Sequence, residues 1–304
     1  MDFHFKMPRT NLTKKLNDLG VYPQNWSTAD EVDQSAVDAV ADELLTSLTP
    51  QEIIDHNIAA YGASTEEYDD KASNQQVVPE LTLFMNLLEE DSLVLDLGSG
   101  HGRDPLYMVD PKSRERLNRK GMVSPVHQLN VVPLEGSRDF LHMTYDKLER
   151  QSNRIPLMVQ GDFTHPGEGE VFFSNRGNLS LESVLTQGNL LPVFDGIWSC
   201  ASYLIHMPEK LLQSSIEGWG KTLKQGGIFA VSYIPPREDR LTTKVLTSRS
   251  APGEIKVFSH YTPEIIDAAF EGAGFAMIDS STGDYGGRGK VQEGFFSNAF
   301  YRKE

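Results

Sequence analysis

Short apolar segments alternate with longer amphipathic ones along most of the chain after residue 90. The apolar segments have the length and the Val, Ile, Leu and Phe content of buried strands. We expect strands at Leu93–Leu97, His127–Leu134, Pro156–Gln160, Phe194–Ser199, Ile228–Tyr233, Phe275–Asp279 and Phe295–Tyr301. Alternation of strands with helices predicts a doubly wound α/β fold, in which a mostly parallel sheet carries helices on both faces.

Helical spacing of apolar residues lies between several of these strands. It predicts helices over Gly136–Arg150, Pro208–Lys224 and Pro263–Gly272. The glycines of Gln225–Gly227 end the second helix, and Thr262 is placed to cap the third.

The chain before the first strand also carries helix signals. Thr49 has the chemistry of an N-cap and Pro50 suits the first helical position, so a helix is expected to begin there. We expect residues 1–50 to form an N-terminal helical extension and residues 51–304 to form the main domain. Three irregular segments, near 110–125, 164–192 and 235–259, are interpreted as insertions that serve as binding loops or lids.

Charge narrows the range of partners. Among 304 residues the formal net charge is -15, and a protein this acidic is repelled by a phosphate backbone. The most basic stretch, Lys112–Lys120, is interpreted as a solvated helix face. We therefore expect no nucleic-acid partner.

Cysteine content and hydropathy bear on compartment and metal chemistry. The chain has one cysteine, Cys200, so it can form no internal disulfide and no cysteine-based zinc site, and we expect no metal. The first ten residues lack the apolar core of a signal peptide, and no stretch approaches the length of a membrane span. These features favour a cytoplasmic protein.

The first predicted strand leads into three glycines at alternate positions, in LVLDLGSGHGRD. Gly98, Gly100 and Gly102 can adopt positive φ and expose N–H groups beside a helix N-terminus. The dinucleotide fingerprint G-x-G-x-x-G would place its third glycine where Arg103 stands. Asp96, just before the turn, suits a ligand amine and would repel a pyrophosphate. The spacing therefore argues against a nicotinamide-dependent oxidoreductase.

Further motifs follow in order after the glycine turn: VPLEGSRDFL, VQGDF, FDGIWSCASYLIHMP, LKQGGIFAVSY and FSHYTPEIIDAAFEGAGF. From about Asn57 to the C-terminus the chain resembles class I S-adenosylmethionine-dependent methyltransferases. More narrowly, it resembles the small-molecule enzymes of the broad "type 11 / type 12" methyltransferase-domain group. The resemblance implies a seven-stranded Rossmann-like sheet, in which Phe295–Tyr301 is the antiparallel strand, and S-adenosylmethionine as cofactor.

The resemblance also assigns roles to residues at the ends of strands. Glu135 would bind the ribose hydroxyls through its two acceptor oxygens, with Asp139 as the alternative. Asp162 would accept from the adenine amino group, and Phe163 would cover the ring. The complete set of cofactor residues implied in this way is Tyr61, Tyr68, Asp96, Gly98, Ser99, Gly100, Arg103, Glu135, Gly161, Asp162, Phe163, Ser199, Cys200 and Ala201.

Two parts of this set carry open alternatives. Tyr61 and Tyr68 either reach the methionine carboxylate or serve as packing aromatics. Arg103 pairs with that carboxylate, with Asp104 beside it or with a surface acid. Cys200 is interpreted as a small buried residue rather than a nucleophile.

His206, in the segment after the fourth predicted strand, is the candidate general base, because its pKa suits proton transfer near neutral pH. A pocket contact or a purely structural role are the alternatives. Methyl transfer to an O, N or S atom of a small-molecule acceptor is the expected reaction. A protein methyltransferase and a non-catalytic cofactor-binding scaffold remain as alternatives.

Overall fold

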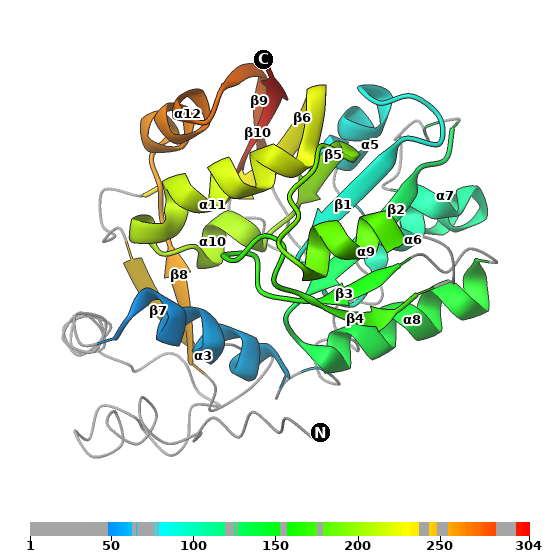
Figure 1. Ribbon diagram of the computed structural model, residues 1–304, viewed down its shortest axis with the longest axis horizontal. Coiled ribbons are helices and arrows are strands. Elements are labelled where there is room, and N and C mark those ends of the chain that lie inside the picture. Colours follow the sequence, from blue (N-terminus) through cyan, green and yellow to red (C-terminus); the bar gives the residue numbers. More distant parts are fainter. Residues whose placement is uncertain are drawn as a thin grey trace.

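The computed structural model describes residues 48–62, 65, 77, 79–118, 125, 127–152, 157–174, 179–236, 243–247, 255–283 and 296–304. Eight strands form one sheet in the order β4-β3-β2-β1-β5-β6-β10-β9 (Figure 1). Its strands are β1 (Leu93–Leu97), β2 (Asn130–Glu135), β3 (Met158–Gln160), β4 (Glu170–Phe173), β5 (Phe194–Ser199), β6 (Leu223–Tyr233), β9 (Phe275–Gly283) and β10 (Phe296–Lys303). The expected extension at residues 1–50 lies almost entirely outside the described residues.

The sheet is mostly parallel, as predicted. β1 pairs in parallel with β2 and β5, and the pairs β2–β3 and β5–β6 are parallel too. β10 runs antiparallel to both β6 and β9, which confirms the expected antiparallel strand. The helices are α3 (Pro50–Gly62), α5 (Pro79–Asn86), α6 (Arg103–Val109), α7 (Pro111–Leu117), α8 (Arg138–Gln151), α9 (Leu179–Thr186), α10 (Tyr203–His206), α11 (Glu209–Thr222) and α12 (Pro263–Gly272).

All three segments interpreted as irregular contain regular structure, and the segment 110–125 supplies α7. The segment 164–192 supplies α9 and β4, which adds an eighth strand antiparallel to β3. The segment 235–259 supplies an antiparallel hairpin of β7 (Thr243–Thr247) and β8 (Ile255–Ser259). The seven expected strands are all present in the sheet. The sheet has one more strand, β4, which the sequence did not predict.

The predicted helix start at Thr49 is confirmed by a reciprocal cap. The Thr49 hydroxyl accepts from the Glu52 backbone N–H at 3.2 Å, and the Glu52 carboxylate accepts from the Thr49 backbone N–H at 2.7 Å. This exchange satisfies donors that the first turn of a helix leaves free. It fixes where α3 begins, and α3 is the helix that reaches the site.

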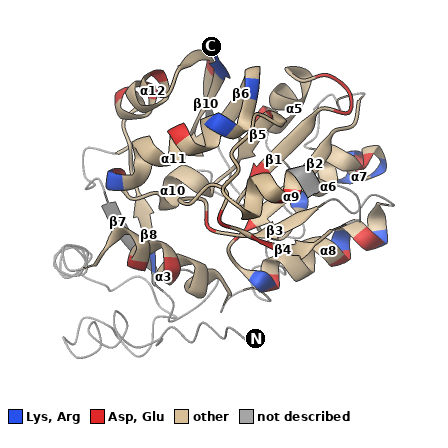
Figure 2. Cartoon of the chain, in the orientation of Figure 1, with Lys and Arg blue, Asp and Glu red and all other residues tan. Residues whose placement is uncertain are grey.

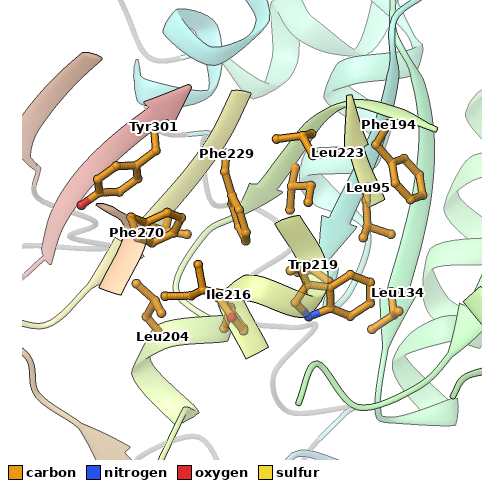
Figure 3. Close-up of a cluster of buried hydrophobic side chains, with 14 of the residues drawn as sticks. Leu95, Leu134, Phe194, Leu204, Ile216, Trp219, Leu223, Phe229, Phe270 and Tyr301 are labelled. Atoms are coloured by element: carbon orange, nitrogen blue, oxygen red, sulfur yellow. The ribbon is translucent and has the colours of Figure 1, made fainter. Parts of the chain in front are cut away.

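Alternate residues of each strand face opposite sides of the sheet, and an apolar cluster is buried on each side. On β1, Leu95 belongs to one apolar cluster and Val94 to the other. In the first cluster the Phe270 and Tyr301 rings stack with centroids 3.8 Å apart, and the buried Trp219 lies farther along the same cluster, near Leu134 (Figure 3). Helices cover this apolar surface on both sides and leave the strand ends to carry polar groups.

The prediction of a solvated basic face over Lys112–Lys120 holds for Lys112 and Arg116, which are exposed, and is wrong for Arg114. Arg114, on α7, is 1% exposed and donates to the backbone carbonyls of Tyr107, Met108 and Pro125. A guanidinium has five N–H donors in a planar fork, so it can donate hydrogen bonds to three carbonyls at once. Over the described part of the chain, charges of both signs are interspersed on α8 and α11 without a continuous basic strip (Figure 2). Among the described helices, none has the length and hydropathy of a membrane span.

Candidate active site

The glycine turn after β1 has the backbone conformation that its sequence predicts. Gly98, Gly100 and Gly102 have φ of 75°, 54° and 82°. A Cβ at Gly98 would lie 1.7 Å from Ser202 Oγ, whereas a Cβ at Gly100 would meet no atom within 4 Å. Gly98 is thus required by packing, and Gly100 leaves bare backbone facing open space.

Two buried polar atoms at this turn have no hydrogen-bond partner among the described residues. They are Oδ2 of Asp96 and Oγ of Ser99, and their residues are 2% and 7% exposed. Burial, followed by the charge of Asp104, raises the pKa of Asp96 well above its ordinary value. Unpaired buried polar groups are rare because each costs about 1–3 kcal/mol. A ligand that donates to both atoms would remove this cost.

Glu135 ends β2 beside the glycine turn. Its Oε2 accepts from the Gly100 backbone N–H at 3.0 Å and its Oε1 from the Ser137 backbone N–H at 2.9 Å. Burial raises the pKa of Glu135, and the hydrogen bonds from Ser137 and Gly100 oppose that shift. The alternative, Asp139, is exposed on α8. The geometry therefore favours Glu135 for a contact near the turn.

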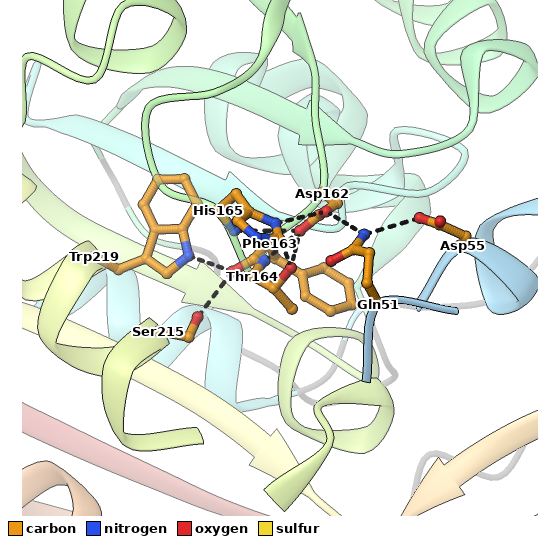
Figure 4. Close-up of polar contacts among 8 residues, drawn as sticks. All are labelled: Gln51, Asp55, Asp162, Phe163, Thr164, His165, Ser215 and Trp219. Carbon is orange, nitrogen blue, oxygen red and sulfur yellow. Dashed lines mark hydrogen bonds and ion pairs between the residues drawn. The ribbon is translucent and has the colours of Figure 1, made fainter. Parts of the chain in front are cut away.

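Asp162 lies two residues beyond β3 and is enclosed by donors (Figure 4). Its Oδ1 accepts from the backbone N–H groups of Thr164 and His165 and from the Thr164 hydroxyl. Its Oδ2 lies 2.9 Å from Gln51 Nε2 and 3.1 Å from His165 Nδ1. Burial alone would raise the pKa of Asp162, but the hydrogen bonds, with that of the Thr164 side chain foremost, bring it below the ordinary value.

The neighbours of Asp162 are held by packing. The Gly161 backbone N–H donates to the Glu135 carbonyl at 3.1 Å. The Phe163 carbonyl accepts from Trp219 Nε1 at 2.7 Å and from Ser215 Oγ at 2.9 Å, and its partly buried ring meets Tyr203 edge to face. These contacts fix the loop that presents Asp162.

The end of β5 is organised by side chain to backbone contacts. Ser199 Oγ donates to the Leu97 carbonyl at 3.0 Å and accepts from the Tyr203 backbone N–H at 3.0 Å. Ala201 has a φ of 51°, a strained conformation for a residue with a side chain. Burial raises the pKa of the Cys200 thiol, which disfavours the thiolate that a nucleophile needs.

Arg103, which opens α6, pairs with Asp104 at 2.6 Å, the second of the alternatives drawn from the sequence. Asp104 also accepts from Trp198 Nε1 at 3.0 Å. The Arg103 guanidinium, with these hydrogen bonds, holds the pKa of Asp104 low although burial acts to raise it.

His206, at the end of α10, lies against Tyr61 of α3. Its Nε2 is 3.1 Å from the Tyr61 hydroxyl, and its Nδ1 is 3.2 Å from the Val257 carbonyl and 3.3 Å from Asn57 Nδ2. Burial lowers the pKa of His206 to about 4, assisted by the charge of Lys256. The imidazole is therefore neutral at pH 7. Tyr68 lies outside the described residues, so its role stays a prediction.

Three residues of this region were missed by sequence reasoning. Asn57 exchanges two hydrogen bonds with the backbone of Val257, at 2.9 Å to its carbonyl and 2.8 Å from its N–H. Lys256 is buried and its Nζ lies 3.5 Å from the centroid of the Tyr61 ring. Gln51 contacts Asp162. The partners of Asn57 and Gln51 are far away in sequence, and no local pattern marks them.

Together these contacts place α3 across the carboxyl ends of several strands (Figure 1). Gln51 reaches the loop after β3, and Tyr61 reaches His206 beyond β5. Between them Ile58 packs on Gly136, which follows β2. Ligands of open parallel sheets bind at these ends. Among the described residues no group of three His, Cys, Asp or Glu side chains is arranged to hold a metal ion.

No protein-family model matches the sequence, and no curated protein matches it. Several solved structures are similar to the chain. One is a 1,6-didemethyltoxoflavin-N1-methyltransferase from Burkholderia thailandensis, with 14% identity over 84% of this chain and 91% of that chain, at a TM-score of 0.52. Another is the CcbJ methyltransferase from Streptomyces caelestis, with 16% identity over 80% of this chain and 98% of that chain, also at 0.52.

TehB from Haemophilus influenzae is similar as well, with 12% identity over 79% of this chain and 67% of that chain, at a TM-score of 0.50. The sheet order and the glycine turn define a doubly wound α/β protein with a ligand site at its strand ends. Within that class, the chain has the fold of the class I S-adenosylmethionine-dependent methyltransferases.

Proposed function

We propose that the chain is an S-adenosylmethionine-dependent methyltransferase that methylates an O, N or S atom of a small molecule. The observation that carries this proposal is the pair of buried atoms, Asp96 Oδ2 and Ser99 Oγ, that have no partner in the described part of the chain and lie beside the bare backbone of Gly100. A carboxylate and a hydroxyl suit an amino-acid ammonium group, and they do not suit a pyrophosphate.

The remaining cofactor residues are proposed from their positions. Glu135, adjacent to Gly100, would accept from the ribose hydroxyls, and Asp162 from the adenine amino group. S-adenosylmethionine supplies a sulfonium methyl group that a nucleophile can attack in line. Gly98, Gly161, Phe163, Ser199, Cys200 and Ala201 would shape the cavity, and Tyr61 and Arg103 would border it.

His206 is our candidate for the group that takes the acceptor's proton. Its depressed pKa keeps it neutral, which a base requires, and also makes it a weak base. The Val257 carbonyl favours a proton on Nδ1, whereas the Asn57 NH₂ group at the same nitrogen can only donate and favours the other tautomer. The proposed role requires the first tautomer, in which Nε2 is the acceptor. The Tyr61 hydroxyl occupies that nitrogen, so a proton reaches His206 through this hydroxyl or after it moves aside.

A small-molecule acceptor is favoured by charge and by one neighbour. The net charge of -15 disfavours nucleic acid. The toxoflavin enzyme was crystallised with its small-molecule acceptor and S-adenosylhomocysteine. A protein acceptor is the alternative, and the segments 164–192 and 235–259 would then border a peptide.

Calorimetry with S-adenosylhomocysteine and with NAD tests the cofactor assignment. We expect binding of the first and none of the second, and the reverse result would assign the site to an oxidoreductase. Label from methyl-labelled S-adenosylmethionine, added with the protein to a size-fractionated lysate, tests the acceptor. Label in small metabolites supports the proposal, label in protein supports the alternative, and no label supports a non-catalytic scaffold.

A matched variant tests His206 in the same assay. His206→Ala should lose most of the label, roughly a 10²–10⁴-fold decrease in rate, while keeping its affinity for S-adenosylhomocysteine. Labelling at the wild-type rate would exclude His206 from the mechanism.

A further inference from the structure

Gln51 holds its side-chain amide between two acids (Figure 4). Its Nε2 donates to Asp55 Oδ1 at 2.8 Å and to Asp162 Oδ2 at 2.9 Å. Ionised carboxylates only accept, and of the two ends of an amide only the NH₂ group donates. The orientation of the amide is therefore fixed by its neighbours, and so is the direction of Oε1.

That oxygen is left without a donor. Gln51 Oε1 is buried and has no hydrogen-bond partner among the described residues. Like Asp96 Oδ2, it is an unsatisfied acceptor on the carboxyl side of the sheet. Because Nε2 of the same amide is bonded to Asp162, Oε1 neighbours Asp162 Oδ2, an acceptor that also lies 3.1 Å from His165 Nδ1. Such a pair is matched by a donor with two N–H groups.

We propose that Gln51 is a specificity-determining residue that reads the 6-amino group of the purine together with Asp162. The inference deepens the proposed function and rests on it. An exocyclic amino group has two N–H donors, one for Gln51 Oε1 and one for Asp162 Oδ2. A purine with a 6-oxo group presents an acceptor to two acceptors and is rejected, because polar groups left unpaired on binding cost affinity.

The test compares two nucleosides by isothermal titration calorimetry. S-adenosylhomocysteine and S-inosylhomocysteine differ in the 6-substituent and the protonation of the ring. We expect Gln51→Ala to weaken S-adenosylhomocysteine roughly tenfold and to change S-inosylhomocysteine little, so that the preference for adenine falls roughly tenfold. Gln213→Ala, which removes an exposed glutamine of α11 that donates to Glu217, is the matched control and should keep the wild-type preference.

Gln51→Met provides a second variant, since it keeps the length of the side chain and removes the acceptor. Urea unfolding of both variants checks that they fold. An unchanged preference in two folded variants would overturn the inference, and would leave Gln51 as a brace between α3 and Asp162. Tighter binding of S-adenosylhomocysteine would also overturn it, because Gln51 would then obstruct Asp162. A wild-type protein that binds neither nucleoside overturns the proposed function together with this inference.

Discussion

Two acids at the carboxyl edge of the sheet, the buried Asp96 and the partly buried Asp162, differ in how many hydrogen-bond donors the chain supplies to them. Asp162 has donors from Thr164, His165 and Gln51, and its pKa lies below the ordinary value. Asp96 has an oxygen without a partner among the described residues, and its pKa is raised. A carboxylate supplied with donors by its own chain contributes to folding. One that lacks them is costly to the free protein and is retained for a partner that arrives from outside.

The largest effect that we expect comes from removing the charge at Asp96. Asp96→Asn should weaken S-adenosylhomocysteine roughly 10- to 100-fold, because a hydrogen bond to a charged group contributes about 1.5–3 kcal/mol. The same variant should keep its free energy of unfolding within about 0.5 kcal/mol, since Asp96 Oδ2 accepts no hydrogen bond from the described residues of the free protein. Calorimetry and urea unfolding measure the two quantities. A loss of stability as large as the loss of affinity would remove the distinction between the acids.

Asp162 should behave in the opposite way. Asp162→Asn turns an acceptor into a donor toward groups that already donate, so the free energy of unfolding at pH 7 should fall by about 1–3 kcal/mol. Asp146→Asn, at an exposed pair with Arg150, is the control and should change it by less than about 0.5 kcal/mol.

The pH dependence of that loss has a defined sign. The folded pKa of Asp162 is depressed, so its contribution is present above the unfolded pKa, roughly 3.9, and is lost as pH falls through the folded value. The difference between the wild type and Asp162→Asn should therefore narrow below about pH 4. A difference that stays constant there would show that the carboxylate charge is irrelevant.

Ligand affinity should depend on pH through Asp96. Burial raises the pKa of Asp96 in the free protein, and an ammonium group bound beside it would lower that pKa, so binding is coupled to the release of a proton. Affinity for S-adenosylhomocysteine should rise with pH until the pH passes that pKa, by at most about tenfold per unit for one proton. Binding heats in buffers of different ionisation enthalpy measure the released proton. Asp96→Asn should release fewer protons, and identical release would assign the proton to another group.

The smallest effect concerns a single donor to Asp162. Thr164→Val removes the hydroxyl that Asp162 accepts from, and should lower the free energy of unfolding by about 0.5–1.5 kcal/mol. Thr164→Ser retains the hydroxyl and should recover most of that loss. Equal destabilisation by both variants in urea unfolding would point to the lost methyl contacts instead.

The sequence was informative where the controlling contacts are local. The strand pattern and the glycine turn depend on neighbours within a few positions, and both were predicted. β4 and the β7–β8 hairpin were missed because strands of four or five residues in long segments give little periodicity. Arg114 was placed on a solvated face because sequence letters do not show three carbonyls converging on it.

The residues of the candidate site also divide into those that local sequence predicts and those that it does not. Asp96 is the penultimate residue of β1, Glu135 ends β2 and Asp162 comes two residues after β3, so their positions at the carboxyl edge could be expected. The contact between Gln51 and Asp162 spans 111 positions, and the one between Asn57 and Val257 spans 200. Such pairs exist only once the chain has folded, and no spacing rule reveals them.

Asn57 has a mechanical consequence. Its side-chain amide offers Val257 the same donor and acceptor that a neighbouring strand would offer. These two hydrogen bonds attach α3 to β8. α3 and β8 cannot separate without breaking both hydrogen bonds. Asn57 thus joins two elements that both contact the buried His206, together with the contacts of Tyr61 to Lys256 and His206, and its loss should weaken the attachment of α3 to β8.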